Sequence, residues 1–540
     1  MTEIIIRPEA VVEKVKNGTT ATVVEDQIPT PALELQHQEL EQDADLVAST
    51  LLHDDDLELD DRLSSLPDDI LSSILERLML PEAARTSVLS RRWRHLFCFR
   101  SIINLDASYF ARKIVKGGEL ERKHLPLISA SLLQAARSML EQQDRQCPIT
   151  TTMISRLYLR FQLREECIDI ISCVDNAMAS GRPIASLWLM MSSEIVDDDC
   201  VNEHWIAYGR RFMKFFDAGP HAFAGVTHLH IECVRLSKDE MYTVLNTCKQ
   251  LDYLCLHVCD CEGQSVLEIE HPRLTKLKIT RCQFVRLVLR CFPKLRVFTC
   301  QSWTTSQYQY PLSFGHVPQL STLLLKNRGA IEAKNFLLSE FLSNVMIDAL
   351  DLDFQSEKIW IRLEAPKLVA PRLQNLRLLF LRCVHGECDL DWIMFFLEAA
   401  PLLKTLHVKV WDHTGCADGD DPRQELFDKR SSILAWEACG DLKHYSLKKL
   451  TIEGYQDEEK FTKFIRRVVE AAVRLELIVL LDSGWCPICN FSPSTRYPQT
   501  NEEMDLTKKQ ISKWRSKPIN VRIGISVLFL ASRWTCVDLM

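Results

Sequence analysis

Two cysteines near the C-terminal end have the spacing that metal ligands and redox motifs use. Cys486 and Cys489 form a C-x-x-C pair in the segment CPIC. A structural zinc site needs four ligands, but no second C-x-x-C pair follows and Cys536 stands alone. A thioredoxin-like role requires a βαβ context, which the surrounding sequence lacks. We therefore expect ordinary loop cysteines and predict no metal site, no redox site and no cofactor.

The chain contains none of the sequence motifs that carry common catalytic chemistry. G-x-S-x-G, H-E-x-x-H and G-x-x-x-x-G-K-[ST] are absent, and His and Asp residues are scattered without a pattern. Acidic residues alternate between positions 54 and 60 as in a calcium loop, but Leu59 occupies the position that needs glycine. The closing glutamate would fall at Ser65. We predict a solvated acidic segment and no catalytic residue.

Composition narrows the class of protein. The chain has 540 residues, 46% of them hydrophobic and 26% charged, with a net charge of −8. This charge argues against a nucleic-acid partner. We therefore interpret a cluster of four arginines in the helical segment, which is named at the end of this paragraph, as a solvated or acid-pairing face. The chain begins without a signal-peptide pattern, and the late apolar run 523–531 is too short to span a bilayer, so we expect no membrane association. We predict a location in the nucleus, the cytoplasm or both, with reduced cysteines. The clustered arginines are Arg91, Arg92, Arg94 and Arg100.

Three short helices are predicted between residues 66 and 97, after an acidic arm over residues 1–61 that we expect to be disordered. Pro67 suits a first helical turn, and the acids that follow it suit the positive end of a helix dipole. Pro81 breaks the pattern, a second helix is predicted from Glu82 to Leu89, and Ser90 is a plausible N-cap for a third. One apolar stripe at helical spacing consists of Leu71, Ile74, Leu75 and Leu78. We expect such short helices to need one another, and a partner surface as well, to bury that stripe.

A leucine phrase recurs from about residue 154 onward. It appears as RLYLRF, SLWLMM, VTHLHIEC, LDYLCLHVC, LTKLKITRC, KLRVFTC, LSTLLLKN, LQNLRLLFLRC, LLKTLHVKV and LKKLTIEGY. The aligned leucines are Leu229, Leu254, Leu277, Leu323, Leu350 and Leu376, which are 25, 23, 46, 27 and 26 residues apart. Phe298 divides the step of 46 into 21 and 25. These periods are typical of leucine-rich repeats.

Each repeat should contribute one strand whose alternate apolar residues face inward, backed by a helix or an irregular segment. In LTKLKITRC the inward set is Leu274, Leu277 and Ile279, and Cys282 takes the turn position, as Cys259 does one repeat earlier. The insert 412–427 is predicted to be a loop. We therefore predict an α+β protein with a three-helix N-terminal unit and a curved α/β solenoid. We expect a protein target on the strand-lined concave face or the loops beside it. The candidates are exposed, non-leucine strand residues, namely Tyr253, Lys276, Lys278 and Arg377.

The helical segment closely resembles an F-box, the adaptor-binding module of Skp–cullin–F-box (SCF) ubiquitin ligases. The resemblance rests on LPDDIL (66–71), ILERL (74–78) and ARTSVLSRRWRHLF (84–97). Residues 444–482 resemble the FBD segment of plant F-box proteins with leucine-rich repeats, and residues 486–514 resemble the tail that often follows it. Together these similarities cover roughly residues 62–520. Two departures are Phe97 in place of the usual tryptophan and Met79-Leu80-Pro81 at the first turn between helices.

The resemblance implies a non-catalytic substrate receptor of an SCF ligase. The F-box would bind a Skp adaptor, and through it the cullin and RING subunits, while the repeats would bind an unknown protein for ubiquitination. Each apolar position of the F-box could instead belong only to its core. The adaptor-binding set implied by the resemblance is Leu66, Pro67, Leu71, Ile74, Leu75, Leu78, Val88, Ser90 and Trp93.

The expected organisation is an arm (1–61), an F-box (62–106), a helical linker (107–153), repeats (154–440), an FBD-like segment (441–482) and a tail (483–540). Two other functions stay open. The chain could be a repeat scaffold that acts outside any ligase, which loss of the adaptor-binding stripe would have favoured. It could also be a small-molecule co-receptor, although its repeats are ragged and lack an evident basic cluster.

Overall fold

A computed structural model describes most of the chain after residue 64. The chain divides into two compact units, Met1–Leu66 and Pro67–Met540, and every helix and strand below belongs to the second. The predicted disordered arm, the predicted loop 412–427 and the pair Cys486/Cys489 lie outside the described residues. The described ranges are 65–115, 120–141, 153–194, 200–261, 266–302, 310–327, 336–355, 359–386, 388–411, 441–482, 497–515 and 517–525.

Three short helices open the second unit, which confirms the predicted N-terminal architecture. They are α2 (Asp68–Arg77), α3 (Leu80–Thr86) and α4 (Arg91–Cys98). Ser90 caps α4 as expected, because its Oγ accepts a hydrogen bond from the backbone nitrogen of Trp93 at 3.2 Å. The second helix was predicted to run from Glu82 to Leu89, and this range was wrong. Helix α3 already begins at Leu80 because Pro81 is tolerated in a first turn, where no intrahelical N–H bond is lost.

A long parallel sheet dominates the remainder of the described chain. It starts with β1, which is followed by the connecting helices α5 (Ala107–Val115) and α6 (Leu125–Glu141). Its fourteen strands, in spatial order, are β1 (Ile102–Asp106), β2 (Arg156–Gln162), β3 (Leu187–Ser192), β4 (Val226–Glu232), β5 (Tyr253–His257), β7 (Lys276–Thr280), β9 (Val297–Gln301), β11 (Thr322–Lys326), β13 (Ala349–Asp353), β15 (Leu378–Val384), β16 (Thr405–Val410), β17 (Lys449–Glu453), β18 (Leu477–Asp482) and β19 (Asn520–Ile525). The sheet follows chain order, so each strand stacks on its predecessor as a solenoid requires.

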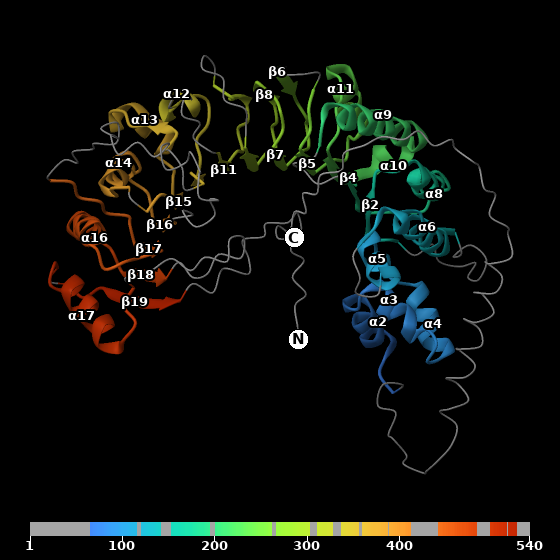
Figure 1. The fold of residues 1–540 in the computed structure, drawn as a ribbon, viewed down its shortest axis with the longest axis horizontal. Helices are drawn as coiled ribbons and strands as arrows, with labels where there is room; N and C mark the ends of the chain where they lie inside the picture. The colour runs from blue at the N-terminus through green and yellow to red at the C-terminus, as the bar shows by residue number, and fades with distance from the viewer. Residues whose placement is uncertain are drawn as a thin grey trace, which may run out of the picture. The chain divides into compact units, whose positions relative to one another are not determined.

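Helices back the long sheet in its first and last parts (Figure 1). They are α8 (Ile168–Ala179), α9 (Asn202–Ala218), α10 (Pro220–Gly225), α11 (Lys238–Thr247), α12 (Leu338–Phe341), α13 (Pro366–Leu373), α14 (Met394–Ala399), α16 (Glu459–Ala471) and α17 (Asn501–Ser512). The expectation of a helix or an irregular segment behind every strand was wrong for the middle repeats. These are backed by a second parallel sheet of β6 (Val266–Ile269), β8 (Arg286–Cys291) and β10 (Leu312–His316). Repeat length alone does not decide this, because the step from Phe298 to Leu323 holds β10 and the step from Leu229 to Leu254 holds α11, although both are 25 residues long.

The predicted inward residues form a continuous buried ladder. Five steps pair the predicted positions, which are Leu229, Leu254, Leu277, Phe298, Leu323 and Leu350. The sixth step was wrong, because Leu350 pairs with Leu379 and not with Leu376. Leu376 is also buried, but it precedes β15. The run LQNLRLLFLRC offers leucines at several offsets, so the alignment alone could not select the register.

The strands of several repeats end in the same turn. Cys233, Val258, Arg281 and Ser302 follow β4, β5, β7 and β9 and have φ between 51° and 58°. Each donates its backbone N–H to the last residue of the next strand, as Val258 does to Thr280 at 2.9 Å. Buried thiols follow these turns as predicted: the Cys282 Sγ atom lies 3.4 Å from the Leu256 carbonyl oxygen. Repeating side-chain and backbone bonds therefore join each unit to its neighbour.

One cysteine pair departs from the expectation of reduced thiols. Cys200 and Cys233 form a disulfide that joins the segment before α9 to the turn after β4. The turn brings the two residues together although they are 33 positions apart in the chain. The free thiols of Cys248, Cys282 and Cys300 are buried, and burial raises the pKa of each. The prediction of reduced, buried cysteines therefore holds for these three, whereas the reduced state was wrong for Cys200 and Cys233.

Two buried histidines tie neighbouring repeats together. His271 Nε2 lies 3.1 Å from the Cys248 carbonyl oxygen, and its Nδ1 accepts the backbone N–H of Leu274 at 3.0 Å. His444 repeats this arrangement with the Ala400 carbonyl oxygen at 3.0 Å and the Leu447 N–H at 3.0 Å. A nitrogen that accepts cannot also carry a proton, so both rings are neutral in the folded chain. The common pattern H-x-x-L-x-x-L was a usable signal that the sequence analysis missed.

We expect these histidines to make the fold less stable as the pH falls below about 6.5. Burial lowers the pKa of His271 and His444 in the folded protein, so the unfolded chain takes up protons first and is favoured. Melting temperatures between pH 7.5 and 5 should therefore fall more steeply for the wild type than for a variant with both histidines changed to glutamine. Equal slopes for the two proteins would contradict this role.

Candidate partner-binding sites

The three N-terminal helices bury one side of their apolar stripe against each other. Leu71 and Leu75 of α2 are fully buried, as are Ala83 of α3 and, to 5% exposure, Trp93 of α4. Leu96 completes this small core. Helices α2 and α4 pack together, and so do α3 and α4. Each short helix therefore buries one side in this core and leaves its outer side available for other contacts.

Two arginines connect these helices, Arg92 at the surface and Arg100 inside. The Arg92 guanidinium forms an ion pair with Asp68 at 2.6 Å and so links α4 to the first turn of α2. Arg100 is buried, donates to the Leu78 carbonyl oxygen at 3.1 Å, and has a pKa lowered by desolvation. Arg92 pairs with an acid as predicted, but the prediction of a solvated or acid-pairing face was wrong for Arg100, which is buried and donates to a carbonyl oxygen. No nucleic-acid contact is needed to account for either arginine.

The structure divides the predicted adaptor-binding set into three groups. Leu71, Leu75 and Trp93 lie in the core, so we expect them to support a binding surface from below. Leu66, Ile74 and Leu78 are half-buried, as is the capping residue Ser90. Pro67 is exposed and Val88 is 80% exposed. Contact between any of these residues and an adaptor stays a prediction.

Three exposed apolar residues of this unit were missing from the predicted set. Ile70 and Met79 are each 44% exposed, and Leu89 is 67% exposed. We call these residues together with Val88 the apolar F-box surface. Exposed apolar groups of this density, in a segment of about twenty residues, are typical of a protein-binding site. Ile70 lies four residues before Ile74, so the helical period could have identified it.

The predicted target-binding residues are only partly brought together. Tyr253 of β5 and Lys276 of β7 are register partners, and Lys278 lies two residues further along β7. Arg377 directly precedes β15, and β9, β11 and β13 separate it from β7. The structure therefore groups three of the four residues and places Arg377 elsewhere on the sheet.

Aromatic side chains continue the line that Tyr253 begins. Tyr158 of β2, Trp188 of β3 and His228 of β4 precede it in register. Adjacent ring centroids are 6.3, 4.0 and 5.8 Å apart along the line. We call these four residues the ring row. Each stands directly before an inward leucine of its repeat, and this shared offset in the sequence could have revealed the row.

The ring row lines a hollow of about 200 Å³ on the strand face of the sheet. Arg156 and Lys276 also line it, and the Arg156 guanidinium lies 4.7 Å from the Trp188 ring centroid. Burial lowers the pKa of His228 to about 4, so this ring is uncharged at neutral pH. The hollow thus combines neutral rings with positive charge, an arrangement suited to binding and without an evident reaction.

The strand face of β13–β17 has a different character, because its charges are paired. Asp351 accepts from Arg382 at 2.8 Å, and Glu453 accepts from Lys409 at 2.7 Å. Burial opposes the ionisation of Glu453, but hydrogen bonds and attraction from His407 and Lys409 outweigh it and lower the pKa to about 2. These buried pairs satisfy one another and offer little unbalanced charge to a partner.

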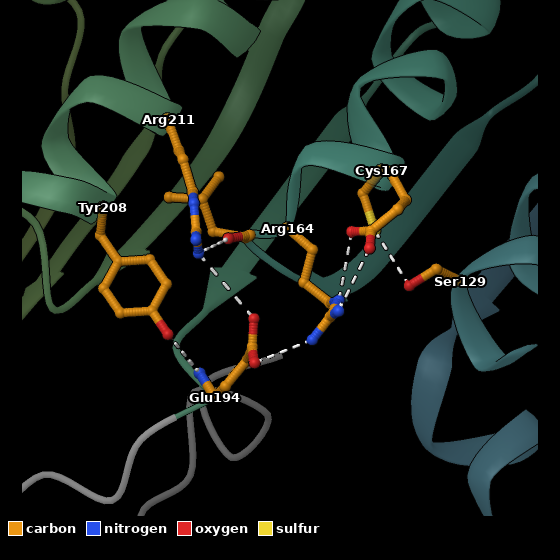
Figure 2. Close-up of polar contacts among 8 residues, drawn as sticks. Ser129, Arg164, Cys167, Glu194, Tyr208 and Arg211 are labelled. Carbon is orange, nitrogen blue, oxygen red and sulfur yellow. Dashed lines mark hydrogen bonds and ion pairs between the residues drawn. The ribbon is translucent and has the colours of Figure 1, made fainter. Parts of the chain in front are cut away.

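A polar cluster at the ends of β2 and β3 fastens the connecting helix α6 to the first repeats (Figure 2). Glu194 accepts from Arg164 at 2.8 Å and lies 3.9 Å from Arg211. The backbone nitrogen of Glu194 donates to the Tyr208 hydroxyl at 3.2 Å. Cys167 Sγ lies 3.3 Å from the Ser129 hydroxyl of α6. Both charges of the arginines face carboxylates, so we assign the cluster a structural role.

The described residues hold no group of three or more His, Cys, Asp or Glu side chains that could bind a metal. Over the same residues, no helix has both the length and the apolar content needed to cross a bilayer.

Two protein families match the chain. Residues 63–104 match the F-box domain family. Residues 217–513, more than half of the chain, match the leucine-rich-repeat (LRR) domain family of At1g61320/AtMIF1. The first match covers the three helices and the apolar F-box surface. The second runs from α9 through α17, and so includes the long sheet from β4 to β18.

Similar proteins of Arabidopsis thaliana have the same two domains in their names. F-box/LRR-repeat protein At4g14103 is 56% identical over 244 residues, which is 44% of this chain and 60% of the relative. F-box/LRR-repeat protein At3g03360 is 23% identical over 455 residues, or 79% of this chain and 86% of the relative. F-box/LRR-repeat protein At5g38396 is 32% identical over 152 residues, which is 28% of this chain and 29% of the relative. The matched parts thus span less than two thirds of At4g14103 and At5g38396.

Proposed function

The chain belongs to the At1g61320/AtMIF1 family of leucine-rich-repeat domains and carries an F-box domain, and on this premise we propose that it is a substrate receptor of an SCF ubiquitin ligase. In this proposal the F-box binds a Skp adaptor, which connects it to cullin and RING subunits. The repeats bind the protein that is to be ubiquitinated.

The apolar F-box surface is the observation that supports adaptor binding most directly. Val88, Leu89, Ile70 and Met79 are 80%, 67%, 44% and 44% exposed. Burial of apolar surface contributes about 25 cal/mol per Å², so a fitting partner would gain substantial binding energy here. The core residues beneath, such as Trp93, would hold this surface in place. A loose linker would need neither the core nor the exposed apolar residues.

The chain needs no chemistry of its own in this role. F-box/LRR proteins are typically non-catalytic adaptors, and neither of the two matched domains is an enzyme domain. Binding adaptor and target together would raise the effective concentration of target lysines near the ubiquitin-charged enzyme. We propose that the protein acts in the nucleus, the cytoplasm or both, where the Cys200–Cys233 disulfide would be an exception among its buried free thiols.

We further propose that residues 444–482, which resemble an FBD segment, are late repeats of the same array. Strands β17 and β18 extend the long sheet without interruption, and α16 backs them as α8 backs β2. The remaining boundaries are proposed as expected from the sequence, with the F-box over 62–106, the helical linker over 107–153, the repeats from 154 and the tail from 483.

We expect the double substitution Val88→Glu, Leu89→Glu to weaken capture of a Skp adaptor at least tenfold, or about 1.4 kcal/mol. Two carboxylates would have to lose water on entering an apolar interface. The free protein should stay folded, because both side chains are exposed. The measurement is co-expression with a Skp adaptor, followed by a quantified pull-down of wild type and variant.

Leu506→Glu on α17 is the matched control, because Leu506 is 65% exposed and lies outside the F-box. It should capture the adaptor as the wild type does. A folded wild-type protein that captures no adaptor would instead favour a repeat scaffold outside any ligase.

A further inference from the structure

The ring row is held in a fixed orientation before any partner binds. Trp188 Nε1 donates to the Ser186 hydroxyl at 2.7 Å, and Ser186 lies 2.8 Å from the Thr227 hydroxyl. Thr227 in turn lies 3.1 Å from His228 Nδ1. This chain of hydrogen bonds provides partners for Trp188 Nε1 and His228 Nδ1 and restrains the rotation of both rings. A partner that contacts the rings would therefore spend little free energy on ordering them.

The size of the hollow limits what it can hold. Its volume of about 200 Å³ is below the roughly 300–1,000 Å³ of typical small-molecule sites. Its lining is mostly aromatic and apolar, with Leu189, Met190 and Leu229 beside the rings. One large apolar side chain of a longer chain fits these properties better than a whole small ligand does.

Positive charge flanks the rings. Arg156 lies over the Trp188 ring, and no carboxylate in the described part of the chain forms an ion pair with it. Lys276 follows Tyr253 in register at the other end of the row. Burial is the main cause of the low pKa of His228; of the charged neighbours, Asp252 acts most strongly and raises the pKa, whereas Lys276 and Arg156 lower it. One carboxylate and two cations therefore lie close enough to act on the centre of the row.

On the basis of the proposed function, we propose that the ring row binds an acidic peptide segment of the target protein. One aromatic or large apolar side chain enters the hollow, and carboxylates on either side of it approach Arg156 and Lys276. The segment crosses the strands from β3, which the Arg156 guanidinium overlies, to β7. Three strand spacings of about 4.8 Å give about 14 Å, which four residues of extended chain span at about 3.3 Å each.

Two comparisons favour this proposal: one between two regions of the strand face, and one between an acidic peptide and single-stranded nucleic acid as the ligand. The strand face of β13–β17 holds the buried pairs Arg382–Asp351 and Lys409–Glu453, whereas Arg156 at the ring row lies over a ring and has no ion pair with a carboxylate in the described part of the chain. Rings and cations can also bind single-stranded nucleic acid by stacking. A single strand would need a positively charged groove along its backbone, but the hollow is lined by only two cations, Arg156 and Lys276, so we favour the peptide.

Peptide selection tests the proposal on the full-length chain, which is immobilised through a terminal tag. A random octapeptide phage library is selected on the wild type and, in parallel, on Lys276→Glu. We expect the wild type to recover peptides with acidic residues on both sides of an aromatic or large apolar residue. The most frequent peptide is then synthesised with a fluorophore and titrated by fluorescence anisotropy. Binding should be at least tenfold weaker for Lys276→Glu and Trp188→Ala and should weaken with added salt.

Lys449→Glu is the matched control, since Lys449 is an exposed lysine on the same register row of the sheet at β17. It should bind the peptide as tightly as the wild type. If Trp188→Ala melts at a lower temperature than the wild type, its weaker binding could reflect unfolding, and the result for Lys276→Glu then decides the test. Recovery of no peptide, a basic consensus, equal binding by Lys276→Glu, or displacement of the peptide by a single-stranded octanucleotide would overturn the proposal. Adaptor capture is measured on the same preparations, so a failure of the ligase role is recognised separately from a failure of the peptide site.

Discussion

The substitution Phe298→Ala is expected to lower the free energy of unfolding by about 3–5 kcal/mol. Phe298 is fully buried between Leu277 and Leu323 of the neighbouring strands. Its ring also meets Phe314 of the second sheet edge-on, with 6.0 Å between centroids. Alanine would remove contacts to both sheets at once and leave a cavity that rigid strands cannot close. Urea unfolding followed by circular dichroism would measure the loss.

Val297→Ala is the control for this experiment, because Val297 is half-buried on the opposite face of the same strand. We expect it to cost less than a third as much. In a repeat array each unit contacts only its neighbours, so amide exchange should quicken first in β7, β9 and β11. Equal costs for the two substitutions would show that β9 does not bridge the two sheets as described.

Phe298 also illustrates why the repeat architecture was readable from sequence. The inward position needs bulk and hydrophobicity but not leucine itself, so the spacing of 21 and 25 residues identified the hidden unit. Register failed only where leucines were too frequent, at Leu376 and Leu379. Period and burial thus predict a strand well, whereas hydrogen bonds to the neighbouring strand decide its register.

What lies behind the strands was harder to predict. Segments such as VLEI and RLVLRC are short apolar runs that suit either a strand or a buried helix end. Their pairing as β6 and β8 depends on residues from the next repeat, which no single segment contains. The disulfide of Cys200 and Cys233 is likewise a consequence of the turn after β4 and has no local signal.

The sequence predicted where the candidate sites lie in the chain, but it did not predict which of their side chains are exposed. The helical period placed Leu71 and Leu75 correctly on one stripe, but it could not tell which edge of the stripe faces inward. The structure buries both and exposes Ile70 beside them. On the sheet, Tyr253 and Lys276 were predicted to be exposed, but this was wrong for Tyr253, which is only 8% exposed because its ring packs beside His228. Trp188 and His228 were missed because neither residue stands out within its own repeat. Register makes these four one surface.

We expect Gly454→Ala to lower the free energy of unfolding by about 3 kcal/mol or more. Gly454 forms the turn after β17, with φ of 79°, and its N–H donates to the Leu481 carbonyl oxygen at 2.9 Å. A Cβ atom at this position would overlap the backbone carbonyl of Val410. Backbone in a sheet cannot move aside without breaking the pairing of β16 and β17. Thermal and urea unfolding of the full-length chain would measure the cost.

Gly181→Ala separates this steric effect from the cost of a left-handed residue. Gly181 has φ of 87°, but a Cβ there would meet nothing within 4 Å, so we expect a loss of only about 1 kcal/mol. The repeats themselves support the distinction, because Val258 and Arg281 adopt positive φ in the corresponding turns without being glycine. Left-handed backbone is therefore a tolerated property of these turns, and contact with Val410 is what requires glycine at 454. Similar losses for both glycine variants would attribute the requirement to φ alone.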